Sequence, residues 1–355
     1  MNKINYSKSG VSVLQKTLAT SQTYAKLTKG LSPKTKDIFD RRFGVKSGKI
    51  ETLESIGQSL GITRERVRQI EKVGFNFVKK NHKETLDNVF KEFDSYFQDK
   101  GGFKKEEAIL ADLGGQKNKP YVLFFLMLGD QFLRVCEKRD YYYFWSTMDE
   151  AEKKVKDTLN LLVLDLQKYG SPLFKKELFA NFAVKYNLSN EALLSYLEVA
   201  KRIQANKEGK LGLIDWPEIK PRSVKDKALL VFRKHQKPLH FRKITELIDQ
   251  LGYNLPNKKT HPQTVHNELI KDSRFVLVGR GMYALGEWGY VPGTIKDIIS
   301  NVLKEKPQLT KDDIVKEVLL QRLVEKNTIL IKLNNKKYFQ KDSEGKYFLA
   351  ENQTA

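Results

Sequence analysis

The most restrictive feature of the sequence is the spacing of its three tryptophans. Trp145, Trp216 and Trp288 are separated by 71 and 72 residues, and each closes two short β-like runs around a polar turn. Near-constant spacing of this kind indicates an internal repeat. A fourth passage of the same type, from Lys336 to Glu351, lacks the tryptophan. The sequence therefore predicts four copies of one small unit, each ending in a β-hairpin.

Helix-like segments precede each hairpin. In the third copy they read VKDKALLVFRKH, HFRKITELIDQLG and HPQTVHNELIKD. Pro262 suits the first turn of the last segment, because proline lacks the N–H that a first turn leaves unpaired. Three helices followed by a hairpin is the plan of a winged helix. We therefore expect a fold that is mainly α with small β-hairpin wings, a tandem of one helix-turn-helix and four winged-helix repeats. A set of unrelated small α+β units is the alternative.

The expected domain boundaries follow from these repeats and from a helical stretch ahead of them. A basic N-terminal segment (1–30) precedes a helix-turn-helix (31–82), and winged helices follow at 83–147, 148–220, 221–290 and 291–355. The chain carries 64 Lys and Arg against 43 Asp and Glu, and 18 of the 21 net positive charges lie in residues 1–80 and 221–290. A polyanion is the simplest partner for such a protein, so these two regions are the expected contact surfaces for double-stranded DNA.

The composition excludes several classes of protein. Hydrophobic residues make up 40% of the chain, which is enough for packed cores. The longest apolar run, Tyr121 to Leu128, is far shorter than the roughly 20 residues that span a membrane, and the N-terminus lacks a signal-peptide pattern. The single cysteine, Cys136, provides neither an intramolecular disulfide nor a multi-thiolate zinc site. We expect a cytoplasmic, nucleoid-associated protein with no membrane partner.

The strongest local signal is TLESIGQSLGITRERVRQIEK, which begins at Thr52. It predicts a short helix ending at Leu60, a turn at Gly61 and Ile62, and a second helix with Thr63 as its N-cap. The residues of this second helix that are expected to face the core recur every three or four positions: Val67, Ile70, Gly74 and Phe77.

The polar residues of the second helix then point outward. Arginine pairs with guanine, glutamine with adenine and glutamate with the cytosine amino group, so a helix with this face is suited to reading a major groove. The alternative is a solvated face held by ion pairs between its own side chains. The outward set is Arg64, Glu65, Arg68, Gln69 and Lys72.

Residues 31–80 resemble region 4 of primary sigma factors, the domain that recognises the minus-35 promoter element. The resemblance is carried by RRFGV, by TLESIGQSLGITRERVRQIEK and by the length between them. It implies contact with the flap of the RNA polymerase β subunit and a second helix in the major groove. The residues implied at base edges are Arg64, Glu65, Arg68 and Gln69, and those implied at phosphates are Thr63, Arg66 and Lys72.

Three features depart from the sigma pattern. Gly74 stands where alanine is common, the second helix ends in the unusually apolar FNFVKK, and only 30 residues precede the unit. The apolar helix end indicates packing on the next domain. Because no sigma core precedes the unit, we do not expect a complete sigma factor.

Residues 221–290 contain a second pattern, HPQTVHNELIKDSRFVLVGRGMYALGEWG. It resembles the HARE-type helix-turn-helix, a winged-helix module of the δ subunit of bacterial RNA polymerase, of some restriction systems and of chromatin proteins. Gly279 and Gly281 flank Arg280 at the expected hairpin tip and leave it exposed. The expected DNA contacts are Lys258 and Lys259 on phosphates, Gln263, Thr264 and Asn267 on the helix, and Arg280 on the wing. An adaptor that presents this surface to protein is the alternative.

Two further patterns are set aside. His235, His240, His261 and His266 are spaced five apart within each pair, which does not place two rings on one helix face, so we expect no metal and no cofactor. GVKSGK, from Gly44 to Lys49, lacks the spacing and the final Ser or Thr of a phosphate-binding loop.

These observations predict a non-enzymatic, sequence-specific DNA-binding transcription factor that acts at promoters with bacterial RNA polymerase. The first alternative is a δ-like accessory protein whose winged helices bind protein. The second alternative is the recognition component of a restriction or DNA-processing system.

Overall fold

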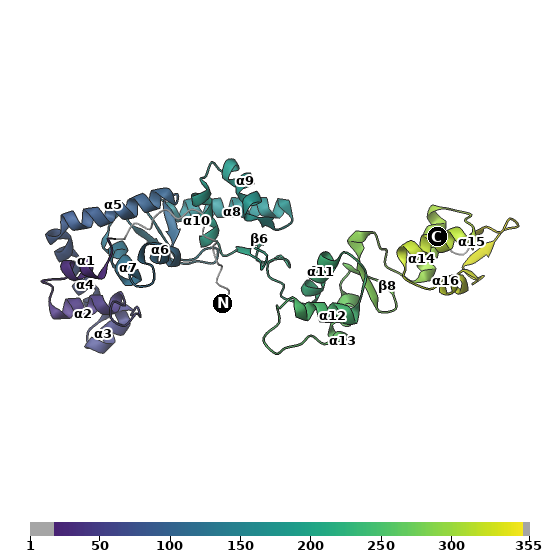
Figure 1. Cartoon of the computed structure of the whole chain (residues 1–355), viewed down its shortest axis with the longest axis horizontal. Coiled ribbons are helices and arrows are strands. Elements are labelled where there is room, and N and C mark those ends of the chain that lie inside the picture. Colours follow the sequence, from purple (N-terminus) through teal and green to yellow (C-terminus); the bar gives the residue numbers. More distant parts are fainter. Residues whose placement is uncertain (1–17, 351–355) are drawn as a thin grey trace. The chain divides into compact units, whose positions relative to one another are not determined.

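The computed structural model describes residues 18–350. Over this range the chain forms helices α1 to α16 and only small antiparallel sheets of two or three strands (Figure 1). The expected fold class, mainly α with small β-hairpin wings, is confirmed. The chain divides into two compact units between Ile214 and Asp215.

The first unit begins with four helices, and each starts at a hydroxyl cap. The side chains of Thr20, Ser32, Thr52 and Thr63 each accept a hydrogen bond from the backbone N–H three residues further on. This bond satisfies one of the donors that a helix start leaves unpaired. The helices are α1 (Ser21–Leu27), α2 (Pro33–Arg42), α3 (Leu53–Leu60) and α4 (Arg64–Asn81).

The first winged helix follows in the same unit. Its elements are α5 (Lys83–Asp99), β1 (Phe103–Lys105), α6 (Glu106–Gly114), α7 (Lys119–Leu128), β2 (Leu133–Val135) and β3 (Phe144–Ser146). Strand β3 lies between β1 and β2 and pairs antiparallel with both. The apolar run that begins at Tyr121 forms most of α7, where Val122, Phe124 and Leu126 are fully buried.

One apolar core joins α1, α2 and α4 to this winged helix, whereas α3 packs through Ile56 in a smaller cluster with Ile38 and Val67. The ring of Phe124 in α7 lies 5.6 Å from that of Phe39 in α2, 5.3 Å from that of Phe43 at the end of α2, and 6.0 Å from that of Phe75 in α4. Tyr24 of α1, which belongs to the expected basic N-terminal segment, lies edge-on to Phe124 at 5.0 Å. The apolar end of α4 therefore packs on the winged helix, and the helix-turn-helix is not a separate globule.

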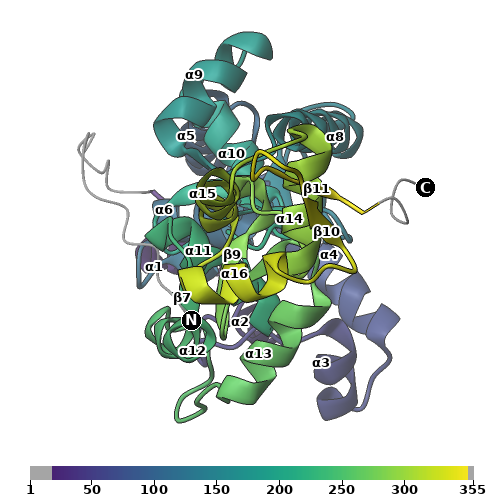
Figure 2. The same cartoon turned by 90° about the vertical axis from the view of Figure 1, so that its right-hand side faces the viewer.

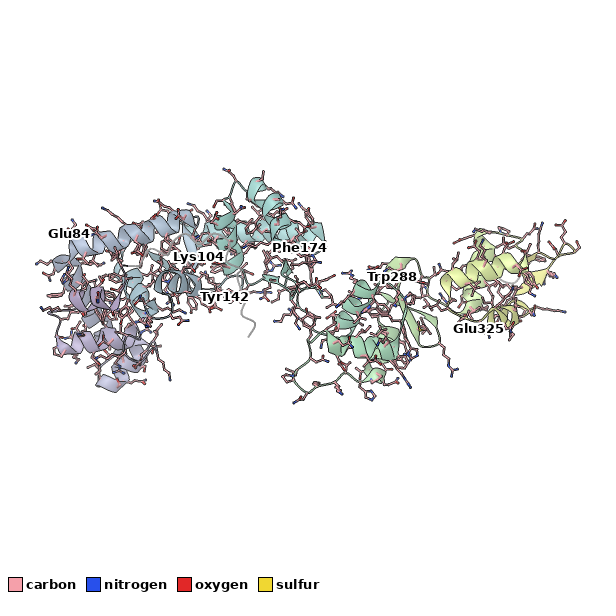
Figure 3. All side chains as sticks on the ribbon, viewed as in Figure 1. Glu84, Lys104, Tyr142, Phe174, Trp288 and Glu325 are labelled. Atoms are coloured by element: carbon pink, nitrogen blue, oxygen red, sulfur yellow. The ribbon has the colours of Figure 1, made fainter. Side chains whose placement is uncertain are left out.

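The second winged helix repeats the same order of elements. They are α8 (Ala151–Tyr169), β4 (Leu173–Phe174), α9 (Lys175–Lys185), α10 (Asn190–Val199), β5 (Ile203–Ala205) and β6 (Lys210–Leu213). Lys104 of β1 forms a buried ion pair with Glu198 of α10 at 2.7 Å, and the N–H of Tyr142 donates to the carbonyl of Val199 at 2.9 Å (Figure 3). These contacts fix the second winged helix to the first.

The second unit holds the third and fourth copies. The third consists of α11 (Val224–His235), β7 (Leu239–His240), α12 (Phe241–Gln250), α13 (Pro262–Lys271), β8 (Phe275–Gly279), β9 (Met282–Leu285) and a 3-10 turn (Gly286–Trp288). Helices α11, α12 and α13 pack around one core (Figure 2). The fourth consists of α14 (Ile295–Glu305), α15 (Lys311–Gln321), α16 (Lys326–Leu333), β10 (Phe339–Lys341) and β11 (Tyr347–Leu349). Leu309 forms a single bridge to Tyr347 where the other copies have a first strand.

Arg322 fixes the fourth copy to the third. Its buried guanidinium donates to the carbonyls of Val291 at 2.7 Å and Gly293 at 2.9 Å in the connecting segment. The N–H of Leu323 donates to the carbonyl of Val278 in β8 at 2.6 Å. The end of β8 that leads into the turn at Arg280 is therefore held by the fourth copy.

The tryptophans occupy different places in the repeat. Trp145 lies in β3 and is 1% exposed. Trp288 lies in the 3-10 turn after β9, half-buried, with its ring 5.9 Å from that of Phe232 (Figure 3). Trp216 follows β6. The copies therefore share the order of their elements rather than one structural role for tryptophan.

Candidate nucleic-acid interface

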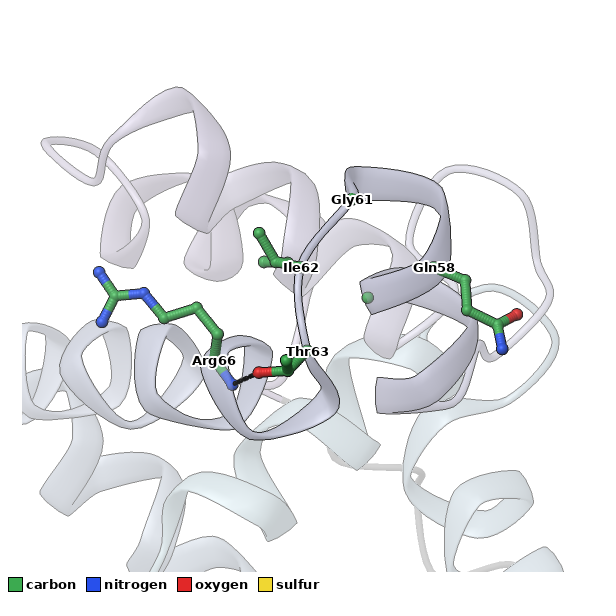
Figure 4. Close-up of a pocket in the computed structure, with 6 residues that line it drawn as sticks. Gln58, Gly61, Ile62, Thr63 and Arg66 are labelled. Carbon is green, nitrogen blue, oxygen red and sulfur yellow. Dashed lines mark hydrogen bonds between the residues drawn. The ribbon is translucent and has the colours of Figure 1, made fainter.

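Helices α3 and α4 form a helix-turn-helix at the positions that the sequence indicated. Gly61 ends α3 with a φ of 65°, and the hydroxyl of Thr63 accepts a hydrogen bond from the N–H of Arg66 at 3.1 Å (Figure 4). A Cβ on Gly57 would lie 2.7 Å from the carbonyl oxygen of Ile62, so this position requires glycine. The residues that line the shallow hollow at the turn are Gly57, Gln58, Gly61, Ile62, Thr63 and Arg66. The turn thus fixes the direction in which α4 leaves it.

The two faces of α4 differ sharply in exposure. Val67 and Gly74 are buried, and Ile70 and Phe77 are half-buried. The residues that the sequence assigns to DNA contact are all exposed: Thr63, Arg64, Glu65, Arg66, Arg68, Gln69 and Lys72. The set is accessible, and its role at base edges and phosphates stays a prediction.

The exposed side chains of α4 bind one another. The guanidinium of Arg68 donates two hydrogen bonds to the carboxylate of Glu65, at 2.8 and 2.7 Å. The Nη1 of Arg66 donates to Oε1 of Gln69 at 3.1 Å. The hydrogen bonds from Arg68 lower the pKa of Glu65, so this carboxylate stays ionised at neutral pH.

Gly74 lies where α4 crosses α2. A Cβ at this position would be 2.6 Å from Cγ2 of Thr35 and 2.8 Å from Cζ of Phe39. The glycine that departs from the sigma pattern is therefore explained by the close approach of the two helices.

Sequence reasoning missed the ion pair between Arg42 of α2 and Glu71 on the buried side of α4. Arg42 and Arg64 face one hollow at the start of α3, whose other walls are Thr52, Leu53 and Glu54. The Nε of Arg42 lies 3.5 Å from Oε1 of Glu71, and burial raises the pKa of that carboxyl. The motif RRFGV contained the signal, but only the rotation of α2 decides which of its arginines faces the hollow.

A second polar face lies on the third winged helix. The residues that the sequence assigns to DNA contact here are also exposed: Lys258, Lys259, Gln263, Thr264, Asn267 and Arg280. The Nε2 of Gln263 donates to Oδ1 of Asn267 at 3.1 Å. Nδ1 of His261 caps α13 by accepting from the N–H of Gln263 at 3.3 Å. The functional role of this face stays a prediction as well.

The two glycines beside Arg280 have different roles. Gly281 has a φ of 70°, and a Cβ on it would lie 2.5 Å from Nε2 of His240. Gly279 lies in β8 without a positive φ, but its Cβ would lie 2.6 Å from the carbonyl oxygen of Leu323. Gly281 thus fits the predicted turn role, whereas Gly279 permits contact with the fourth copy.

Two histidines of this winged helix, His240 and His266, take part in hydrogen bonds of the fold. Nδ1 of His240 accepts from the N–H of Arg242 at 3.3 Å, and Nδ1 of His266 lies 3.1 Å from the hydroxyl of Tyr283. Within residues 18–350, no group of three or more His, Cys, Asp or Glu is arranged to hold a metal ion. In the same part of the chain, no helix is both long and apolar enough to cross a membrane.

Each of the two surfaces lies in a segment of the chain that matches the family model of a helix-turn-helix domain. Residues 29–80 match the family model of sigma-70 region 4. Residues 222–288 match the family model of the HARE-HTH domain, a helix-turn-helix named in part for ASXL proteins and restriction endonucleases. Both resemblances drawn from the sequence are therefore confirmed.

Several curated sigma factors are similar to a short part of the chain, at most about a fifth of its length. The chain is 48% identical over 46 residues to RNA polymerase sigma factor SigA of Nostoc sp., which is 13% of this chain and 12% of that protein. It is 51% identical over 41 residues to SigA1 of Synechococcus elongatus, covering 12% and 10% of the two chains. It is 39% identical over 69 residues to the principal sigma factor HrdD of Streptomyces coelicolor, covering 19% and 21%. The chain thus spans between a tenth and about a fifth of these relatives, and no solved structure matches it.

Proposed function

We propose that the chain is a sequence-specific DNA-binding protein without enzymatic activity that acts at promoters with bacterial RNA polymerase, in transcription initiation or its regulation. The observation that carries the proposal is the outward face of α4. This helix is of the sigma region 4 type, is capped at Thr63, and has every predicted contact residue exposed. Such a protein acts in the cytoplasm, on the nucleoid.

The recognition helix supplies two kinds of contact. The residues proposed at base edges are Arg64, Glu65, Arg68 and Gln69, and those proposed at phosphates are Thr63, Arg66 and Lys72. The bidentate pair of Arg68 and Glu65 holds these two side chains together. A guanine contact by Arg68 and a cytosine contact by Glu65 therefore serve adjacent positions of one site.

The third winged helix supplies a second attachment to the same DNA. Lys258 and Lys259 contact phosphates, and Arg280 contacts the duplex from the wing. Gln263, Thr264 and Asn267 read base edges from α13. Two linked contacts bind more tightly than either alone, because the second forms at a high effective concentration.

The contact with polymerase is proposed to involve the near-neutral part of the chain as well as the helix-turn-helix. Leu161 and Leu164 of α8 are 49% and 52% exposed on the second winged helix, which supports a protein contact there. If the helix-turn-helix also binds the β-subunit flap, it does so outside the apolar face of α2 and α4 that Phe124 covers.

The exposed leucines also favour a second candidate function, an RNA polymerase accessory protein whose winged helices bind protein. Footprinting of promoter DNA with the purified chain, with and without RNA polymerase, separates the two. Protection by the chain alone is expected for the proposed function, whereas protection only with polymerase supports the accessory protein. Cleavage of the DNA in the presence of magnesium would contradict both.

The DNA sequence that the chain recognises is identified by selecting the duplexes that it binds from a pool of random sequences. A control is needed that removes DNA reading by the helix-turn-helix. Deletion of residues 1–82 is unsuitable, because it would expose the core that this part of the chain shares with the first winged helix. The double substitution Arg68→Ala and Gln69→Ala removes two exposed side chains and leaves that core intact. It is expected to change the selected sequence.

A further inference from the structure

The outward face of α13 contains an apolar residue beside its amides. Gln263, Asn267 and Ile270 are related by four and then three residues and so share one face of the helix. All three are exposed, and Ile270 is 62% exposed. Val265 and Leu269 are buried on the side of α13 that faces the core. Ile270 therefore does not serve the packing of the module.

The wing, which is joined to α13 by a side-chain hydrogen bond, carries a second exposed apolar side chain. Leu277 of β8 is 50% exposed and lies opposite Tyr283 in the hairpin register. The hydroxyl of Tyr283 lies 3.1 Å from Nδ1 of His266, the residue that precedes Asn267 in α13. This hydrogen bond ties the wing to the helix beside the face formed by Gln263, Asn267 and Ile270.

We propose that this face reads an adenine–thymine base pair in the major groove, with Ile270 against the 5-methyl group of the thymine and the two amides on the adenine. The inference rests on the proposed DNA-binding function of the third winged helix. The hydrogen bond from Nε2 of Gln263 to Oδ1 of Asn267 leaves Oε1 of Gln263 as an acceptor and Nδ2 of Asn267 as a donor. Adenine presents the complementary pair, the N6 amino donor and the N7 acceptor.

The thymine methyl group is the apolar feature of base edges in the major groove. Contact with Ile270 removes it from water without leaving a polar group of the protein unpaired. The same residue would be unfavourable beside the amino group of cytosine, because it offers no acceptor. The face is therefore suited to discrimination as well as to affinity.

The test uses the full chain and a duplex obtained by selection from random sequences. Each thymine of the selected site is replaced singly by uracil, which removes only the methyl group. We expect one such replacement to weaken binding by about fourfold, which corresponds to about 0.8 kcal/mol for one methyl group. Ile270→Ala is expected to bind more weakly and to be insensitive to that same uracil.

Two further variants sharpen the test. Ile331→Ala truncates a comparably exposed isoleucine, 70% exposed on α16, and is expected to keep the response of the unaltered chain to uracil. Asn267→Ala is expected to be insensitive to replacement of the paired adenine by 7-deazaadenine, which lacks N7. Ile331 and Asn267 are both exposed, so neither substitution is expected to change the fold.

Failure of the inference and failure of DNA binding give different results. A selection that retains no duplex contradicts the DNA-binding function and the inference with it. If duplexes are retained but no uracil weakens binding, or if Ile270→Ala responds to uracil as the unaltered chain does, the methyl contact is wrong. Loss of polymerase binding by Ile270→Ala at unchanged DNA affinity would show that the face contacts protein.

Discussion

Among single residues, Arg68 is expected to determine one base position. A bidentate arginine contact discriminates guanine from the other bases, so Arg68→Ala is expected to cost about 1–3 kcal/mol on the selected site and to relax one position only. The measurement is affinity for sets of four duplexes that differ at one base pair. Arg139→Ala, which removes an exposed arginine of the first winged helix, is the matched control. Equal weakening on all four duplexes would place Arg68 on a phosphate.

Glu71 is expected to make stability depend on pH. Burial raises the pKa of Glu71 in the folded protein, so the folded state holds the proton of this carboxyl more tightly than the unfolded state does. The stability gained from the bound proton is present below the pKa of Glu71 in the unfolded state. It is lost as the pH rises through the pKa of Glu71 in the folded state. Glu71→Gln keeps the shape and removes the charge. It is expected to stabilise the protein by about 1 kcal/mol at neutral pH and to lose that advantage as the pH falls to about 4.

Urea unfolding of Glu71→Gln at both pH values measures this effect. Glu84→Gln changes an exposed carboxylate of α5 and should shift stability by less than about 0.5 kcal/mol at either pH. If Glu71→Gln instead loses stability at neutral pH, the ion pair with Arg42 at 3.5 Å outweighs the cost of burial.

Among the elements, the recognition helix depends on its cap. Thr63→Ala removes the acceptor of the Arg66 N–H and is expected to lower the free energy of unfolding by about 1 kcal/mol and to weaken DNA binding, because the first turn of α4 frays. Thr63→Ser is expected to retain both properties. Thr310→Ala removes the equivalent cap of α15 and should lower stability without changing DNA affinity. Equal losses of affinity in both alanine variants would show that the cap acts only through global stability.

The crossing of α2 and α4 reverses the usual effect of replacing a helical glycine. Alanine in place of glycine inside a helix normally stabilises by about 1 kcal/mol. At Gly74 the added Cβ meets Thr35 and Phe39 at 2.6 and 2.8 Å. Gly74→Ala is therefore expected to destabilise by about 1–3 kcal/mol in thermal or urea unfolding. Thr35→Ser in the same chain should restore part of the loss, and a stabilised Gly74→Ala would show that the helices are not held this closely.

Local patterns and long-range packing were not equally predictable from the sequence. The caps, the turn at Gly61 and the two faces of α4 follow from neighbouring residues, and the structure has them where the sequence places them. The place of Phe124 among Phe39, Phe43 and Phe75 does not follow, because a phenylalanine in an apolar run is equally compatible with a core of its own module. Likewise, nothing in the repeat pattern distinguishes Arg322, whose partners are backbone carbonyls of a distant segment.

At the scale of the whole molecule, the two basic surfaces lie in separate compact units. Within each unit, neighbouring domains are fixed by buried contacts: the core around Phe124 and the ion pair between Lys104 and Glu198 in the first, and Arg322 in the second. Each surface is therefore presented by a body larger than one domain. Binding of both surfaces to one DNA molecule should consequently behave as two linked events rather than five.

Linked binding is tested by disabling one surface at a time. Lys258→Ala with Lys259→Ala is expected to weaken binding to a duplex that contains both sites by at least tenfold. It should also lower the slope of log affinity against log salt by about 2, because each phosphate contact releases about one counterion. Lys336→Ala with Lys337→Ala removes the same charge from two adjacent exposed lysines of the fourth winged helix and is the matched control. An equal effect of both double variants would mean that the positive charge acts through the general field of the protein. An unchanged affinity of the Lys258→Ala, Lys259→Ala variant would mean that the third winged helix does not bind the DNA that α4 binds.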